Sequence, residues 1–273
     1  MNAPLLDASQ RAEFETNGWT VVRGLLSQSE VDDLRADCMR LLRREIPVHG
    51  RDYCDMTGSY EKRAEDFEIL NVMLPRRYHP AWQHNVYELR ARKVAEQLLG
   101  NDIGIDYDQL VCKPPHKAGA VFHWHQDLAY WPKTDDPRTA TFWLALDVVD
   151  ADNGSVHFVD GSHREHDLRP HRPLFADRGD NHSLLARLEA RDQPRTARLQ
   201  PGDCTIHHER TLHGSPGNAS DRWRRGYVLA FRSLATIERE RAMGFTHSHN
   251  DDPALLARIA EDTKRTGAQY GAQ

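Results

Sequence analysis

The chain has 273 residues, of which 39% are hydrophobic and 28% charged, and its formal net charge is −5. This composition is typical of a folded globular protein, and acidic residues are interspersed with the basic ones, so we expect no nucleic-acid partner. Apolar runs are too short for a transmembrane helix and the first residues lack a secretory signal pattern, so we expect a cytoplasmic protein without a membrane partner.

The cysteines are scattered along the sequence and contain no CxxC pair: Cys38, Cys54, Cys112 and Cys204. A disulfide framework is not expected in a chain of this size, and reduced thiols fit the cytoplasm. A zinc site built on cysteines is also disfavoured, because no close pair of thiols is present to begin it.

The first hundred residues predict helices around one strand. The run GWTVVRGLL, at 18–26, is typical of a strand. Ser27 or Ser29 then caps a helix, whose apolar positions recur at helical spacing: Val31, Leu34, Cys38, Leu41 and Leu42. A further helix is predicted near 82–99, and Gly100 supplies its stop signal.

Residues 47–77 form a polar stretch between two predicted helices, and the pattern predicts an irregular segment. Long irregular segments within compact domains are often functional, which favours a substrate lid. A solvated connection explains the same pattern equally well, so both interpretations stay open.

Beyond residue 101 the pattern changes to short β-branched and aromatic runs, separated by turn signals such as DNG, DGS, QPGD and HGSPGN. Many short strands without βαβ alternation favour a jelly roll over a doubly wound sheet. We therefore predict one mainly β domain with flanking helices. Its helical N-terminal part spans about 1–100, its jelly-roll core about 101–235 and its helical C-terminal tail about 236–273.

The most informative residues lie in FHWHQD and TLHGSPGN. His125 and Asp127 are two residues apart on a predicted strand, so their side chains point to the same side. His213 follows a later strand-like run and can complete the group. Two histidines and one carboxylate can occupy one face of an octahedral iron and leave three positions open. These three residues are the candidate metal ligands.

Competing histidines are weaker candidates. A second HxD, at 249–251, lies beyond the last predicted strand, where a rigid site is hard to build. HxE pairs begin at His163 and His207, but we interpret these histidines, like His208, as structural. No HExxH is present, which argues against a zinc hydrolase.

An arginine that follows the second histidine could bind the far carboxylate of a dicarboxylic cosubstrate, because guanidinium groups pair with carboxylates in two-point geometry. Arg224 and Arg225 both lie at the start of the strand-like run RRGYVLAF. Neighbouring residues on a strand face opposite ways, so only one of them can point into the cavity. Spacing alone does not choose between them.

Together these motifs resemble the phytanoyl-CoA dioxygenase family, within the 2-oxoglutarate oxygenase superfamily. The resemblance runs from FETNGWTVVRGLLSQSEV to RRGYVLAF and is densest in KPPHKAGAVFHWHQDLAYWP, DADNGSVHFVDGSHREHDLRPH and PGDCTIHHERTLHGSPGN. It implies a double-stranded β-helix, the jelly-roll core of cupin-like proteins, with N-terminal helices packed around it.

The resemblance also implies roles for single residues. Three of them would hold Fe(II): His125, Asp127 and His213. The arginine of the family lies eleven residues after the last histidine, which selects Arg224 over Arg225 as the 2-oxoglutarate ligand. Trp143 and Gln109 fall at positions that line the same cosubstrate pocket.

The expected activity is that of an Fe(II)- and 2-oxoglutarate-dependent dioxygenase. It would hydroxylate or otherwise oxidise a C–H bond of a small-molecule metabolite, using O2 and converting 2-oxoglutarate to succinate and CO2. Asp127 disfavours halogenation, since related halogenases have Ala or Gly in its place. Two alternatives stay open: a catalytically silent relative that acts by binding, and a cupin-like metalloenzyme that does not use 2-oxoglutarate.

The expected partner is a small-molecule substrate, and the sequence indicates neither its identity nor an oligomeric state. No run of basic residues marks a cradle for a CoA diphosphate. Tyr130 and Trp131, which follow the predicted metal strand, and His123, two residues before His125, are the candidates for lining the substrate cavity.

Overall fold

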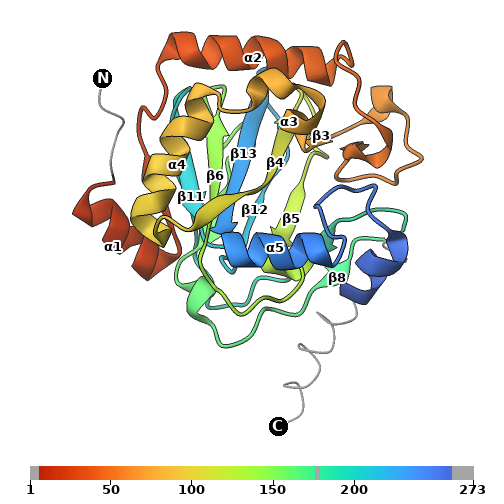
Figure 1. The fold of residues 1–273 in the computed structure, drawn as a ribbon. Helices are drawn as coiled ribbons and strands as arrows, with labels where there is room; N and C mark the ends of the chain where they lie inside the picture. Colours follow the sequence, from red (N-terminus) through yellow and green to blue (C-terminus); the bar gives the residue numbers. More distant parts are fainter. Residues whose placement is uncertain (1–5, 176–178, 260–273) are drawn as a thin grey trace.

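The computed structural model describes residues 6–175 and 179–259. Its centre is a pair of antiparallel sheets, with helices on the outer face of the larger one (Figure 1). The strands of the seven-stranded sheet are, in spatial order, β1 (Trp19–Val22), β11 (Cys204–His207), β6 (Thr139–Ala145), β13 (Arg224–Ser233), β4 (Ile103–Lys113), β3 (Leu70–Met73) and β2 (Tyr53–Asp55).

The smaller sheet has four strands, in the order β10 (Pro194–Thr196), β7 (His157–Val159), β12 (His213–Ser215) and β5 (Phe122–His125). A separate pair is formed by β8 (Arg172–Pro173) and β9 (Leu184–Leu185). Two packed antiparallel sheets are the predicted jelly-roll architecture, so the fold class inferred from the sequence is confirmed.

The α-helices are α1 (Ala8–Asn17), α2 (Gln28–Leu42), α3 (Pro75–Tyr78), α4 (Val86–Leu99) and α5 (Leu234–Ala242). Short 3-10 turns are η1 (Gly50–Asp52), η2 (Ala64–Asp66), η3 (Pro80–Trp82), η4 (Asp127–Tyr130) and η5 (Ser162–Arg164). Residues 253–259 are also helical, and the rest of the predicted tail, 260–273, lies outside the described residues. No helix in the described ranges has the length and apolar character that crossing a bilayer requires.

Strand β6 shows how the sequence builds two cores. Phe142 and Leu144 pack with α2 and α4 on the outer face of the large sheet. Trp143 and Ala145, one residue out of phase, belong to the second core, on the inner face. Because side chains alternate along a strand, the apolar run FWLA in β6 contributes side chains to both cores.

The predicted N-terminal helices are confirmed where their signals were strongest. Ser27 caps α2 through a capping box with Glu30, and all five apolar positions of that helix are buried. Helix α4 ends at Gly100 as predicted. The N-terminal part is not purely helical, however, because β1, β2 and β3 extend the large sheet at its two edges. The single-domain organisation stays a prediction.

Much of the segment 47–77 is irregular, as predicted, but the prediction missed two short strands within it. It contributes β2 and β3, which pair with each other, and β3 also pairs with β4. The buried carboxylate of Asp55 accepts backbone N–H groups of Thr57, Glu68 and Ile69. This local network satisfies the backbone where the polar residues gave no strand signal.

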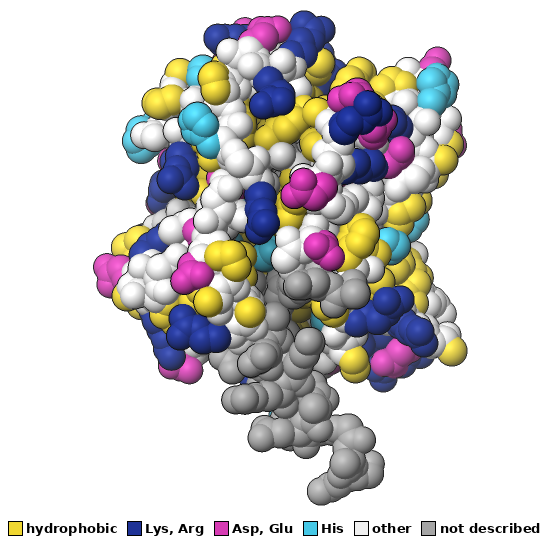
Figure 2. All heavy atoms as spheres, turned by 90° about the vertical axis from the view of Figure 1, so that its right-hand side faces the viewer, with side chains coloured by type: hydrophobic (Ala, Val, Ile, Leu, Met, Phe, Trp, Pro, Cys, Tyr) yellow, Lys and Arg dark blue, Asp and Glu magenta, His cyan; other side chains and the backbone are white. Residues whose placement is uncertain are grey.

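The face of the molecule seen in Figure 2 carries basic and acidic side chains side by side, with histidines and apolar groups among them. No field of a single sign covers the described part of this face, which agrees with the mixed charge pattern of the sequence.

Candidate active site

The two histidines of the candidate metal centre face each other across the small sheet. His125 on β5 and His213 on β12 are cross-strand partners, and their ring centroids lie 4.2 Å apart. The Nδ1 of His125 lies 2.7 Å from the carbonyl of His123, and that of His213 lies 2.9 Å from the carbonyl of Thr211. Each Nδ1 must therefore donate, which leaves each Nε2 with a free lone pair.

Asp127 completes the group, although strand β5 is shorter than predicted. The strand ends at His125, and Asp127 begins η4. Gln126 between them keeps an extended backbone, so both side chains still project to one side. Asp127 Oδ1 lies 3.5 Å from His125 Nε2 and 3.6 Å from His213 Nε2. These three ligand atoms lie within 4.8 Å of one another.

The other carboxylate oxygen of Asp127 is held by two groups that the sequence did not single out. The hydroxyl of Thr141 lies 3.2 Å from Oδ2, and His207 Nε2 lies 3.3 Å from it. The sequence predicts only a structural role for His207, but this contact also makes it a support of a metal ligand. Together these contacts direct Oδ1 toward the two histidines, the kind of support that orients metal ligands.

The electrostatics of the group fit a cation. Burial alone raises the pKa of the Asp127 carboxyl, but the neighbouring imidazoles, His213 first and then His125 and His207, hold that pKa well below its ordinary value. Burial lowers the pKa of the His213 imidazole. Two imidazole Nε2 atoms and one carboxylate oxygen are the donor set of a non-haem Fe(II) site, and the residues present fit that ion.

A cavity of about 490 Å³ opens between the two sheets beside these residues. We call it the Arg224 chamber; its walls include Gln109, Val111, Trp143, Ser215, Arg224 and Val228. The Arg224 side chain is fully buried, yet within the described part of the chain its Nε and Nη1 have no hydrogen-bond partner. Burial lowers the pKa of this guanidinium to about 10, so it stays charged at neutral pH.

Trp143 forms the surface on which Arg224 rests, with the guanidinium carbon 4.5 Å from the ring centroid. Gly226 makes room for this arrangement, because a Cβ there would lie 2.1 Å from the Trp143 ring. The Gln109 amide donates to Asn71 Oδ1 and also lines the chamber. The structure therefore brings Arg224, Trp143 and Gln109 into one cavity.

Arg225 points the other way. Its guanidinium forms an ion pair with Asp147, with Nη2 2.6 Å from Oδ1. The strand alternation that the sequence left undecided is thus resolved by packing: one arginine is paired outside the chamber and the other is unpaired inside it.

A second cavity, of about 480 Å³, meets the first at the metal ligands. We call it the His247 chamber; its walls include Met56, Met73, Tyr130, Trp131, Phe245 and His247. Both chambers share Tyr107, Gln109, Phe122, His125 and Asp127. The candidate metal centre thus lies where the two chambers join. The first chamber reaches the Arg224 guanidinium, and the second is walled mainly by aromatic rings.

Of the three candidate substrate residues, Tyr130 and Trp131 line the His247 chamber and His123 lines neither chamber. The contribution of His123 is its backbone carbonyl, which orients His125. Several wall residues were not singled out from the sequence, because they come from segments far apart: Met56, Met73, His182, Phe245 and His247.

The competing motifs are explained by their surroundings. His249 is buried in the chamber wall with its Nδ1 3.4 Å from Cys54 Sγ, whereas Asp251 accepts the backbone N–H of Thr246. The two residues of this HxD therefore have separate tasks. His163 lies 3.2 Å from the carbonyl of Glu15, away from the candidate centre.

Comparisons with known proteins agree with this geometry. The model of the family described as phytanoyl-CoA dioxygenase (PhyH) matches residues 14–226. A probable alpha-ketoglutarate-dependent hypophosphite dioxygenase of Stutzerimonas stutzeri is 29% identical, over 82% of this chain and 78% of its own length. The L-proline trans-4-hydroxylase of Streptomyces griseoviridis is 27% identical, over 81% of this chain and 83% of its own.

Among solved structures, EvdO2 from Micromonospora carbonacea var. aurantiaca, in complex with 2-oxoglutarate, superposes with a TM-score of 0.66. It is 27% identical, and the match covers 85% of this chain and 93% of EvdO2. The family and fold predicted from the sequence are confirmed by these matches.

Proposed function

This chain belongs to the phytanoyl-CoA dioxygenase family, and from that premise we propose that it is a non-haem Fe(II)- and 2-oxoglutarate-dependent dioxygenase. The reaction oxidises a C–H bond of a small molecule, typically to an alcohol, while O2 converts 2-oxoglutarate to succinate and CO2. The relatives named as dioxygenase and hydroxylase support this reaction class.

The observation that carries the proposal is the buried guanidinium of Arg224, whose Nε and Nη1 have no hydrogen-bond partner among residues 6–175 and 179–259. A buried charge without a partner is costly, so it is expected where a ligand of opposite charge completes the site. The Arg224 chamber runs from this cation to the three metal ligands. A dicarboxylate that binds the metal at one end and Arg224 at the other fits this arrangement. A cupin-like enzyme without such a cosubstrate has no use for the lone cation.

Each side chain then has a defined task. His125, Asp127 and His213 hold Fe(II), and Thr141 and His207 fix the orientation of the Asp127 carboxylate. Arg224 binds the far carboxylate of 2-oxoglutarate, supported by the ring of Trp143. Bound iron and 2-oxoglutarate supply the oxidising chemistry, and the protein positions the reactants and excludes bulk water.

The substrate is placed in the His247 chamber, because this chamber also reaches His125 and Asp127 but is not lined by Arg224. Met56, from the segment 47–77, lines this chamber, which supports the interpretation of that segment as a cover over the substrate. We further propose a cytoplasmic location and no nucleic-acid or membrane partner; the four free, buried cysteines fit a reducing compartment.

The test is an anaerobic visible absorption titration of the Fe(II)-loaded protein with 2-oxoglutarate. We expect a metal-to-ligand charge-transfer band that requires both additions, followed by substrate-stimulated release of succinate when metabolites are screened. Iron binding without the band would contradict the proposal. A cosubstrate-independent metalloenzyme or a silent binding relative would then be the better account.

A further inference from the structure

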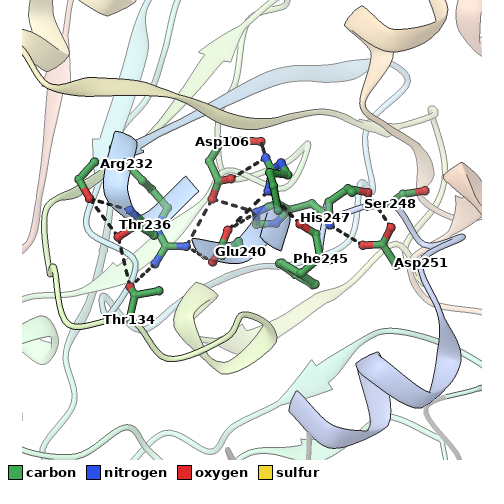
Figure 3. Close-up of polar contacts among 12 residues, drawn as sticks. Asp106, Thr134, Arg232, Thr236, Glu240, Phe245, His247, Ser248 and Asp251 are labelled. Carbon is green, nitrogen blue, oxygen red and sulfur yellow. Dashed lines mark hydrogen bonds and ion pairs between the residues drawn. The ribbon is translucent and has the colours of Figure 1, made fainter. Parts of the chain in front are cut away.

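Beneath the His247 chamber lies a buried network of charges from three elements of the fold (Figure 3). Asp106 comes from β4, Arg232 from β13 and Glu240 from α5, and His247 lies on the segment after α5. His247 Nε2 lies 2.9 Å from Asp106 Oδ2 and 3.3 Å from Glu240 Oε2. Arg232 Nη1 contacts the same two carboxylates.

This group has the donor atoms of a metal site but is already filled by cations. The ligand atoms of Asp106, Glu240 and His247 lie within 4.8 Å of one another. However, Arg232 bridges the two carboxylates, and Arg241 Nη2 lies 2.7 Å from the second oxygen of Asp106. A metal ion would have to displace one guanidinium and approach the other, so the network is a set of ion pairs.

The two carboxylates favour the cationic form of the His247 imidazole. Burial by itself lowers its pKa, but the carboxylates of Asp106 and Glu240 overcome that effect and raise the pKa above its ordinary value. Since Nε2 lies between two carboxylate oxygens, it must donate its proton to them. The ring cannot turn away, because it stacks on Tyr107 at 4.6 Å between centroids and contacts Trp131 edge-on at 5.5 Å.

The backbone of His247 also indicates that the ring is held in one position. Its φ is +66°, a left-handed conformation that costs free energy for a residue with a side chain. The surrounding contacts must offset this cost, and they hold the ring at the wall of the chamber.

The second ring nitrogen, Nδ1, is the available one. The side-chain hydrogen bonds that His247 forms with described residues all involve Nε2, and the residue lines the chamber. An imidazolium carries a proton on both nitrogens, so Nδ1 is a charged donor on the chamber wall. The described residues that line this chamber include no lysine or arginine.

We propose that His247 is a specificity-determining residue: its Nδ1–H donates to an anionic oxygen of the substrate. The substrate class is then a small molecule with an apolar body, packed among the aromatic rings, and one oxyanion group, a carboxylate or a phosphoryl-type anion. The inference rests on the proposed function, because it takes the His247 chamber as the substrate side of the metal centre.

The surrounding charges support an anion at this point. Two acids, Asp106 and Glu240, face His247 Nε2 from β4 and α5, and the arginines Arg232 and Arg241 pair with these acids. Burial raises the pKa of Glu209, which contacts Arg232, to about 7. While Glu209 is protonated, the three cations exceed the two remaining anions by one charge.

The chamber contains other ionisable groups besides His247. Burial raises the pKa of the Tyr107 phenol well above its ordinary value, so this ring stays neutral. His182 and His249 also line the chamber, with their rings 4.7 Å apart. These two histidines provide matched controls for a test of His247.

The experiment compares two probes of the same shape, cyclohexanecarboxylate and cyclohexanecarboxamide. Each is titrated by calorimetry into the anaerobic protein loaded with Fe(II) and 2-oxoglutarate, so that the Arg224 chamber is filled. We expect the carboxylate to bind about tenfold more tightly than the amide at pH 6, as for a charge-assisted hydrogen bond. His247→Gln should reduce the preference below about threefold, whereas His182→Gln should keep it.

A pH series on the unmodified protein tests the same point without a variant. His247 is protonated below its raised pKa and loses its charge as pH rises through that value, so the preference for the carboxylate should disappear at high pH. Equal affinities at every pH, no binding of the carboxylate, or an undiminished preference in His247→Gln would overturn the proposal.

The two proposals fail separately. If 2-oxoglutarate gives no charge-transfer band, the proposed function fails. The loss of carboxylate preference from the unmodified protein to His247→Gln still measures the role of His247 in the iron-loaded protein, because any binding at Arg224 is common to both. A normal band with no carboxylate preference would overturn only the role of His247.

Discussion

Two buried clusters of histidine and carboxylate each contribute residues to the wall of the His247 chamber, and they differ in what neutralises them. In the first, His125, Asp127 and His213 are free of arginine contacts within the described chain. In the second, Asp106 and Glu240 are bound by Arg232 (Figure 3). The donor atoms are alike, so the position of a guanidinium separates a candidate metal centre from a structural ion network.

Two fully buried arginines of β13 repeat this contrast. Arg232 contacts three acids, Asp106, Glu209 and Glu240, whereas Arg224, at the other end of the strand, pairs with none within the described residues. A paired buried charge stabilises its own surroundings, and an unpaired one marks the place of a ligand. Exposure alone would not distinguish them.

The largest expected effect separates the two clusters directly. Asp127→Ala removes the carboxylate ligand and should lower turnover by about a thousandfold or more, with loss of bound iron. Asp106→Ala should keep one equivalent of iron per chain, because the second cluster binds none. Iron content and succinate release measure both. Iron retained in Asp127→Ala but lost in Asp106→Ala would reverse our assignment.

The next effect is on stability. Arg232→Met leaves three acids without their shared cation and should lower the free energy of unfolding by about 3–5 kcal/mol. Arg224→Met removes an unpartnered buried charge and should leave the metal-free protein as stable as before, or more stable. Denaturant unfolding of the two variants gives the comparison, and a similar loss in both would remove the distinction.

The third prediction concerns 2-oxoglutarate. Arg224→Met should raise the Kd for 2-oxoglutarate about a hundredfold, because a buried carboxylate loses its charged partner. Arg225→Met loses only the ion pair with Asp147 and should change that Kd less than about fivefold. The anaerobic charge-transfer titration measures both values. Equal changes would contradict our choice between the two arginines.

The smallest effect sharpens the contrast on strand β4. Asp106 is paired with cations, whereas burial raises the pKa of Asp108 to about 7 and no described cation forms an ion pair with it. The folded state therefore holds this proton between about pH 4 and 7 and the unfolded state releases it, so the contribution of Asp108 to stability is lost as pH rises.

Asp108→Asn removes this dependence. The stability of the unmodified protein should fall relative to that of the variant from pH 4 to 7, by at most about 3 kcal/mol, the value for the full shift in pKa. Parallel pH profiles of unfolding would show that Asp108 is already ionised in the folded state.

The candidate metal ligands were within reach of the sequence because their geometry is mostly local. The side chains of His125 and Asp127 point to the same side because the backbone between them is extended, although the strand itself ends at His125. The jelly roll followed from short strands and turns, and α2 from its cap and apolar spacing. The segment 47–77 was the exception, since buried hydrogen bonds to Asp55 replace a strand signal.

What the sequence determined by itself is a list of chemical groups and their local direction along helices and strands. Only the tertiary structure decided which of two adjacent arginines lines the chamber, since that depends on Trp143 and Asp147 from the neighbouring strand and the loop after it. The same holds for His247, whose charge comes from carboxylates on β4 and α5. Long-range packing, not local spacing, sets whether a buried charge has a partner.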